Sequence, residues 1–114
     1  MLNNPKPGEA PERTAFFISD GTGITAETFG SSLLSQFEDV KLRYVRLSFT
    51  DDEQKAGEAV NRINQQGRID GRRPIVFSTL VNTGISDIVQ TARALYLNLI
   101  ATFVEPLEKE LGVG

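Results

Sequence analysis

The sequence predicts an α/β fold of three layers, in which a parallel β-sheet lies between flanking helices. Apolar runs at 14–19, 41–49 and 74–78 alternate with segments of helical spacing, which is typical of strands joined by crossover helices. The first and third runs are uninterrupted, as in strands buried on both faces. The second run carries three basic residues, which favours an edge position. We therefore predict three to four strands in the order 2-1-3-4, as in Rossmann or flavodoxin-like folds.

The amino-acid composition excludes several classes of protein and of functional site. With 114 residues, of which 39% are hydrophobic and 24% charged, the chain fits one folded domain. It has no cysteine and no histidine, which excludes disulfides, thiol catalysis and histidine acid–base chemistry, and we expect no metal site. The formal net charge of −3 gives nucleic-acid binding no support. No apolar stretch reaches the ~18 residues of a membrane span, so we expect a cytoplasmic protein without membrane contact.

Two regions are expected along the chain. Residues 1–12 should form a disordered tail, because Pro5, Pro7 and Pro11 oppose regular structure. Residues 13–114 should form the α/β domain. Its first strand, 14–19, ends in an Asp-Gly pair.

The first helix is predicted over residues 25–38. Its apolar stripe consists of Ala26, Phe29, Leu33 and Phe37, with Leu34 beside it. Gly30 costs roughly 1 kcal/mol within a helix relative to alanine, and close packing against the sheet would explain it.

The second strand is followed by a predicted capping box. Thr50 is the expected N-cap and Glu53 the acidic residue at the third helical position. Gly67 is the expected end of this helix. The residues Arg68–Arg73 then form a basic loop before the third strand, 74–78.

The third helix is expected to begin near Asn82-Thr83-Gly84, with apolar positions from Ile85 to Tyr96. Residues 97–102 fit either a fourth strand or a continuation of that helix, because neither glycine nor proline separates the two. A final helix should start at Glu105-Pro106 and run to Leu111, since proline is tolerated in the first helical turn.

The predicted strand order creates a candidate binding crevice. It places the turn after the first strand beside the end of the third strand, at the carboxyl ends of the strands, where open α/β sheets bind ligands. Hydroxyls, backbone amides and a helix N-terminus can together bind phosphate without a lysine, although ordinary helix and turn capping would use the same residue types. The candidate phosphate- or phosphopeptide-binding residues are Asp20, Gly21, Thr22, Gly23, Thr25, Ser78 and Thr79. Asp20 has two interpretations, a structural cap of the turn or a general base or metal ligand.

Two nucleotide motifs bear on this turn. Gly21 to Ala26 matches the dinucleotide fingerprint G-x-G-x-x-A. The acid that would hold a ribose is missing, because the second strand ends in Leu47-Ser48-Phe49, so we do not favour NAD or FAD. A P-loop, G-x-x-x-x-G-K-[ST], does not occur in the sequence.

A second candidate site is the basic loop. Arg68, Arg72 and Arg73 could receive a phosphorylated or acidic partner. The competing interpretation is a solvated loop, because loops often carry charge.

The string Ser19-Asp20-Gly21-Thr22-Gly23-Ile24-Thr25-Ala26-Glu27 resembles the N-terminal signature of the bacterial phosphoenolpyruvate synthase regulatory proteins. The pyruvate, phosphate dikinase regulatory proteins of plants belong to the same family. Residues 73–80 and 105–108 are also similar to it, so that the resemblance covers about residues 14–112.

The resemblance implies a bifunctional serine/threonine kinase and phosphorylase. Family members inactivate their target by phosphorylating a threonine with ADP, and reactivate it with inorganic phosphate, which releases pyrophosphate. The family's nucleotide site is a P-loop in the second half of its chain, so we expect that domain, and the ADP site, outside this sequence. No P-loop residue can be carried over onto this chain, the signature carries over without an assigned catalytic role, and the target, phosphoenolpyruvate synthase or pyruvate, phosphate dikinase, stays open.

Three hypotheses follow for these 114 residues. In the first, the crevice receives the target's phosphothreonine segment or the attacking phosphate. In the second, the chain is a non-catalytic docking module that recognises the target enzyme through the basic loop or the edge strand. In the third, it is an independent nucleotide-binding protein. A homo-oligomer is compatible with all three, because apolar surface is expected near Phe103, Val104 and Leu107.

Overall fold

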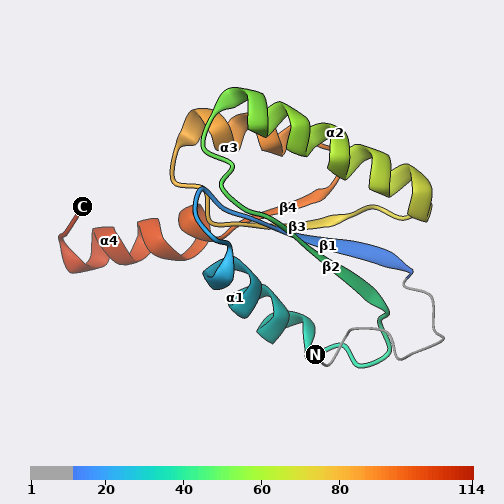
Figure 1. Cartoon of the computed structure of the whole chain (residues 1–114). Helices are drawn as coiled ribbons and strands as arrows, with labels where there is room; N and C mark the ends of the chain where they lie inside the picture. The colour runs from blue at the N-terminus through green and yellow to red at the C-terminus, as the bar shows by residue number, and fades with distance from the viewer. Residues whose placement is uncertain (1–11) are drawn as a thin grey trace.

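The computed structural model describes residues 12–114 and contains the predicted parallel sheet (Figure 1). The strand order is β2-β1-β3-β4, and every pairing is parallel. The predicted order 2-1-3-4 is therefore confirmed. The strands are β1 (Arg13–Ile18), β2 (Leu42–Leu47), β3 (Ile75–Ser78) and β4 (Leu95–Asn98). Apart from Glu12, the predicted tail at 1–12 lies outside the described residues.

Helices cover both faces of the sheet. Figure 1 shows α2 and α3 on one face and α1 on the other, while α4 extends away from the sheet. The helical elements are α1 (Ile24–Leu34), α2 (Glu53–Asp70), α3 (Thr83–Gln90), the π-helix η1 (Ile100–Val104) and α4 (Glu105–Leu111). The three layers, and a final helix from Glu105 to Leu111, agree with the sequence-based expectation.

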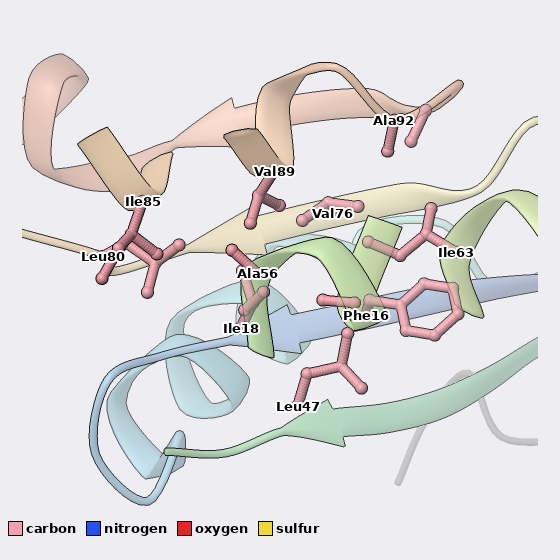
Figure 2. Packing of buried hydrophobic residues seen from close by; sticks show 12 residues of the cluster. Phe16, Ile18, Leu47, Ala56, Ile63, Val76, Leu80, Ile85, Val89 and Ala92 are labelled. Atoms are coloured by element: carbon pink, nitrogen blue, oxygen red, sulfur yellow. The ribbon is translucent and has the colours of Figure 1, made fainter. Parts of the chain in front are cut away.

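The core beneath α2 and α3 follows from the alternation of side chains along β1. Phe16 and Ile18 point to this face, and Phe16 lies in register with Val45 of β2 and Val76 of β3. Figure 2 shows Ala56 and Ile63 of α2 and Val89 of α3 packing onto these strand residues. Buried apolar area of this kind contributes about 25 cal/mol per Å², which holds the helices to the sheet.

On the other face of the sheet, α1 packs unusually close to the strands. A Cβ atom on Gly30 would lie 2.6 Å from Cε1 of Phe17 and 2.9 Å from the ring of Phe77. The predicted reason for this glycine is confirmed. The predicted stripe was partly wrong, because Leu33 and Phe37 are 41% and 58% exposed. The helix turns Ala26, Gly30 and Leu34 to the sheet instead, and it ends at Leu34.

Both predicted ends of α2 were wrong. The N-cap is Asp52, whose Oδ1 accepts a hydrogen bond from the Lys55 amide at 2.7 Å. Thr50 is buried and its hydroxyl donates to the Leu47 carbonyl at 3.1 Å, so it cannot cap the helix. At the other end the helix passes Gly67 and continues to Asp70, where Gly71 takes the left-handed conformation of a C-cap (φ 65°). Arg68 therefore belongs to the helix and not to a loop.

The segment after α3 resolves the alternatives left open by the sequence. Asn82 caps α3 by accepting from the Ile85 amide at 3.1 Å, near the predicted start. The helix ends at Gln90, earlier than expected, and Leu95 and Tyr96 lie in β4. Residues 97 and 98 complete β4, and the π-helix follows from Ile100. The fourth strand is therefore present but starts two residues before the range in question.

Candidate functional site

A cavity of about 480 Å³ opens at the carboxyl ends of β1 and β3. This is the edge at which the strand order predicted a crevice. One wall is polar and formed by Ser19, Gly21, Thr22, Gly23, Thr25 and Thr79. The other wall is apolar and formed by Ile24, Phe29, Leu99, Ile100, Phe103 and Val104. Of the seven residues predicted for the site, the five at positions 21, 22, 23, 25 and 79 line this cavity.

The turn after β1 is held by the segment that follows β2. The Ser19 hydroxyl accepts from the Gly21 amide at 2.9 Å. The Phe49 amide donates to the Gly21 carbonyl at 2.7 Å, and the Ser48 hydroxyl donates to the Thr22 carbonyl at 2.5 Å. The turn is therefore fixed before any ligand binds. Ser48 stands where a dinucleotide site would need its acid, and its hydroxyl is already used.

The N-terminus of α1 opens onto this cavity. Its N-cap, Gly23, has φ 87° and no side chain with which to cap the helix. The Thr22 hydroxyl accepts from the Ile24 amide at 3.4 Å, a long hydrogen bond. No side chain among the described residues caps the following amides, Thr25 and Ala26. Unpaired amides at the positive end of a helix dipole favour an anion.

Two predicted residues do not line the cavity. Ser78 is fully buried, and its hydroxyl accepts from the Leu80 amide at 3.2 Å and from the Tyr96 hydroxyl at 2.9 Å. It therefore joins β3 to β4. Asp20 is exposed, and the turn is capped by the hydroxyl of Ser19 rather than by its carboxylate.

The apolar wall of the cavity was missed by sequence reasoning. Three of its six residues, Ile100, Phe103 and Val104, come from η1, a π-helix, which is a rare conformation that is frequent at functional sites. The Phe103 ring meets the Phe29 ring edge to face, with centroids 5.2 Å apart, so that η1 is joined to α1. The Asn98 side chain accepts from the Ala101 amide at 3.0 Å and marks the start of this segment. Only that asparagine could have indicated it.

Glu27, the last residue of the signature, supports the site from outside. Its carboxylate accepts from Nε of Arg46 on β2 at 2.5 Å. The same arginine packs beside the site's glycine, because a Cβ atom on Gly23 would lie 3.5 Å from its Cδ. Glu27, in the first turn of α1, thus ties that helix to the edge strand β2 through an ion pair.

The predicted basic residues lie at the amino-terminal ends of β3 and β4, at the other end of the strands from the crevice. Arg68, Arg72 and Arg73 line a groove of about 440 Å³ together with Arg93, which sequence reasoning missed. Arg93 lies 20 residues further along the chain than Arg73, and only the return from α3 to β4 brings it there.

Residues 12–114 contain no group of three or more acidic side chains close enough to hold a metal ion. Within the same range, no helix has the length and apolar character needed to span a membrane.

Comparison with known proteins places this fold and site in context. A family model described as kinase/pyrophosphorylase matches residues 15–114. Relatives from Janthinobacterium sp. (strain Marseille), Herminiimonas arsenicoxydans and Marinobacter nauticus are 56%, 55% and 51% identical over 104, 101 and 100 residues. Each of them carries the name "Putative phosphoenolpyruvate synthase regulatory protein". The matches cover 91%, 89% and 88% of this chain but 36%, 36% and 37% of the relatives, so the chain spans little more than a third of their length.

Proposed function

The chain belongs to the kinase/pyrophosphorylase family, and from this membership we propose that it is part of a bifunctional enzyme that regulates phosphoenolpyruvate synthase. In one direction, a threonine hydroxyl of the target attacks the terminal phosphorus of ADP, which forms phosphothreonine and releases AMP. In the other, inorganic phosphate attacks the phosphothreonine, which restores the hydroxyl and releases pyrophosphate. The names of the relatives support phosphoenolpyruvate synthase as the target in preference to pyruvate, phosphate dikinase.

The crevice is the acceptor side of this reaction. The observation that carries the proposal is the uncapped N-terminus of α1, which opens into the same cavity as the side chains of Thr22, Thr25 and Thr79. Amides and hydroxyls of this kind bind phosphate oxygens. The apolar wall around Phe103 offers a surface to the peptide that carries the phosphothreonine.

The chemistry of the lining favours a single phosphoryl group over a nucleoside diphosphate. None of the residues that line the described cavity is a lysine or an arginine. A nucleotide phosphate chain with its greater charge is normally gripped by a lysine and a glycine-rich loop, which supports an ADP site formed by residues outside this chain. Phosphoryl transfer depends on positioning and on stabilisation of charge, so two partners that close on one reaction can supply both.

Substitutions in the crevice of the full-length enzyme test this proposal. Thr22→Val together with Thr25→Val removes two hydroxyls from the lining without a large change of volume. Because hydrogen bonds to charged groups contribute about 1.5–3 kcal/mol each, we expect ADP-dependent inactivation and phosphate-dependent reactivation to slow by about tenfold or more. Thr28→Val is the matched control, because Thr28 lies on the same helix but outside the cavity lining. Both reactions at the original rates in the double variant would contradict the proposal.

A second candidate function, docking without catalysis, is favoured by one observation. Four arginines line the groove at the edge of the sheet opposite the crevice. A docking module would still bind the target when Thr22 and Thr25 are both replaced by valine. It would lose that binding when the arginines of the groove are replaced by glutamates. The two surfaces share no lining residue, so substitutions in each can be tested separately.

A further inference from the structure

We propose that the groove lined by Arg68, Arg72, Arg73 and Arg93, here called the arginine groove, binds an acidic segment of a partner protein. The groove is separate from the crevice. The proposal therefore does not depend on any phosphoryl transfer at the other edge of the sheet.

The arginine groove is built from three segments of the chain. Arg68 comes from the last turn of α2, Arg72 and Arg73 from the turn after Gly71, and Arg93 from the loop before β4. The Asn64 side chain accepts from the Arg93 amide at 2.7 Å and ties that loop to α2. Nη2 of Arg73 donates to the Ala94 carbonyl at 3.1 Å and ties the turn to the same loop. These hydrogen bonds fix the backbone from which the arginines project.

The four guanidinium groups have no acidic partner within the described part of the chain. The ion pairs of residues 12–114 use Arg43, Arg46 and Lys55 instead. Asp70 lies close by in the sequence, but its side chain is 5% exposed and is bonded to Thr14 at 2.8 Å and to Gln66 at 2.8 Å. An arriving carboxylate would therefore meet four positive charges without displacing another carboxylate, although Nη2 of Arg73 also holds the Ala94 carbonyl.

The residues that line the arginine groove between the guanidinium groups also suit a peptide. Its remaining lining includes Gly67, Pro74, Ala92 and Ala94, which are small or apolar. Gly67 packs closely on Pro74, because a Cβ atom on this glycine would lie 3.0 Å from Cδ of the proline. Arginine forms bidentate hydrogen bonds with carboxylates, and small apolar side chains of the partner can pack against the apolar part of the lining.

The charge of the whole chain favours a short acidic segment over a nucleic acid. Its formal net charge is −3, and when the four positive charges of the groove are set aside the rest of the chain carries −7. A long polyanion would have to run across this negative remainder, which repels it. A peptide that spans only the groove avoids the repulsion.

Fluorescence anisotropy with the chain as it stands tests the proposal. The probes are a labelled eight-residue peptide of aspartate, glutamate and alanine, its asparagine and glutamine counterpart, and a single-stranded oligonucleotide of eight nucleotides. We expect the acidic peptide to bind, to weaken as salt is raised, and to bind about tenfold or more weakly to Arg72→Glu with Arg93→Glu. Arg62→Glu is the matched control, because Arg62 is an exposed arginine of α2 outside the groove, and it should change binding by less than about twofold.

Three results would overturn the proposal. They are the absence of binding by the acidic peptide, equal binding by the original chain and the double variant, and tighter binding of the oligonucleotide than of the peptide. The milder pair Arg72→Gln with Arg93→Gln should weaken binding in the same direction while unfolding at the same urea concentration as the original chain. This second pair separates a loss of binding from a loss of fold.

Discussion

Gly30 of α1 lies against Phe17 of β1 at a distance that no other residue could reach, because an added Cβ atom would stand 2.6 Å from the phenyl Cε1. This contact sets how closely α1 approaches the sheet. Since α1 begins at the crevice, the same contact fixes where its uncapped N-terminus lies. A glycine in the core thus positions the site that the preceding turn forms.

Gly30→Ala should lower the free energy of unfolding by about 2–3 kcal/mol, because forcing a methyl group into a packed core displaces two phenyl rings. Urea unfolding measures the change. Gly57→Ala is the matched control, since a Cβ atom on this glycine of α2 meets nothing within 4 Å. The control should be stabilising by roughly 0.5–1 kcal/mol, because alanine is the better helix former. Equal effects of the two substitutions would refute the close contact.

Asp70→Ala should destabilise the fold by about 1–3 kcal/mol. The carboxylate accepts from the Thr14 hydroxyl at 2.8 Å and pairs with Arg43 at 3.5 Å, and Thr14 is fully buried. The substitution leaves a buried hydroxyl without its acceptor, which carries the penalty of desolvation. Thermal unfolding measures the loss, and Asp87→Ala, at an exposed position of α3, should change stability by less than about 0.5 kcal/mol.

Phe49→Asn should raise stability by roughly 0.5–1 kcal/mol. Phe49 has φ 55° and its side chain is 56% exposed, so the backbone occupies the left-handed region without burial of the ring to offset the cost. Asparagine tolerates this conformation far better than phenylalanine. Urea unfolding checks the direction. A loss of stability would show that the exposed ring makes contacts that outweigh the backbone strain.

The pKa of Asp51 should lie below the ordinary value for aspartate. The Lys55 ammonium donates a hydrogen bond to this carboxylate at 2.8 Å and attracts its charge, which lowers the pKa of Asp51 and raises that of Lys55. The resulting stabilisation is present above the ordinary aspartate pKa and is lost as the pH falls through the lowered one. An NMR titration measures the pKa, and Lys55→Met should return it upwards. Because the pair is exposed, added salt should also reduce the shift.

The fold was predictable where burial and charge pointed the same way. The uninterrupted run at Phe16 and Phe17 fitted a buried strand, and the arginines at 43 and 46 favoured an edge position; the structure confirms both. A central first strand beside an edge second strand leads to the order 2-1-3-4. This order brings Thr22 and Thr79 to one cavity. The position of the crevice therefore followed from topology, without knowledge of any side-chain contact.

Features that depend on tertiary contacts were not predictable. The close packing of Gly30 was expected, but the hydrophobic stripe wrongly placed Leu33 on the buried face of the same helix. Thr50 and Asp52 are both good N-caps by residue type, and the Leu47 carbonyl decides between them by engaging the threonine.

Several residues of the candidate sites could not be assigned from the sequence for the same reason. Ser78 resembles a crevice hydroxyl until Tyr96, in the neighbouring strand, binds it. Arg93 joins the arginine groove only through the return of the chain from α3. Apart from Asn98 at its start, no residue pattern marks the π-helix that supplies part of the apolar wall.

The most direct test of the central claim is an amide NMR titration of this chain with inorganic phosphate, with a phosphothreonine peptide copied from phosphoenolpyruvate synthase, and with ADP. The crevice account predicts that phosphate or the peptide shifts the amide resonances of Thr25 and Ala26, at the uncapped start of α1. It also predicts that Thr22→Val with Thr25→Val weakens this effect and that ADP binds no more tightly than phosphate. Unchanged resonances with both phosphate and the peptide, or preferential binding of ADP in the crevice, would contradict it.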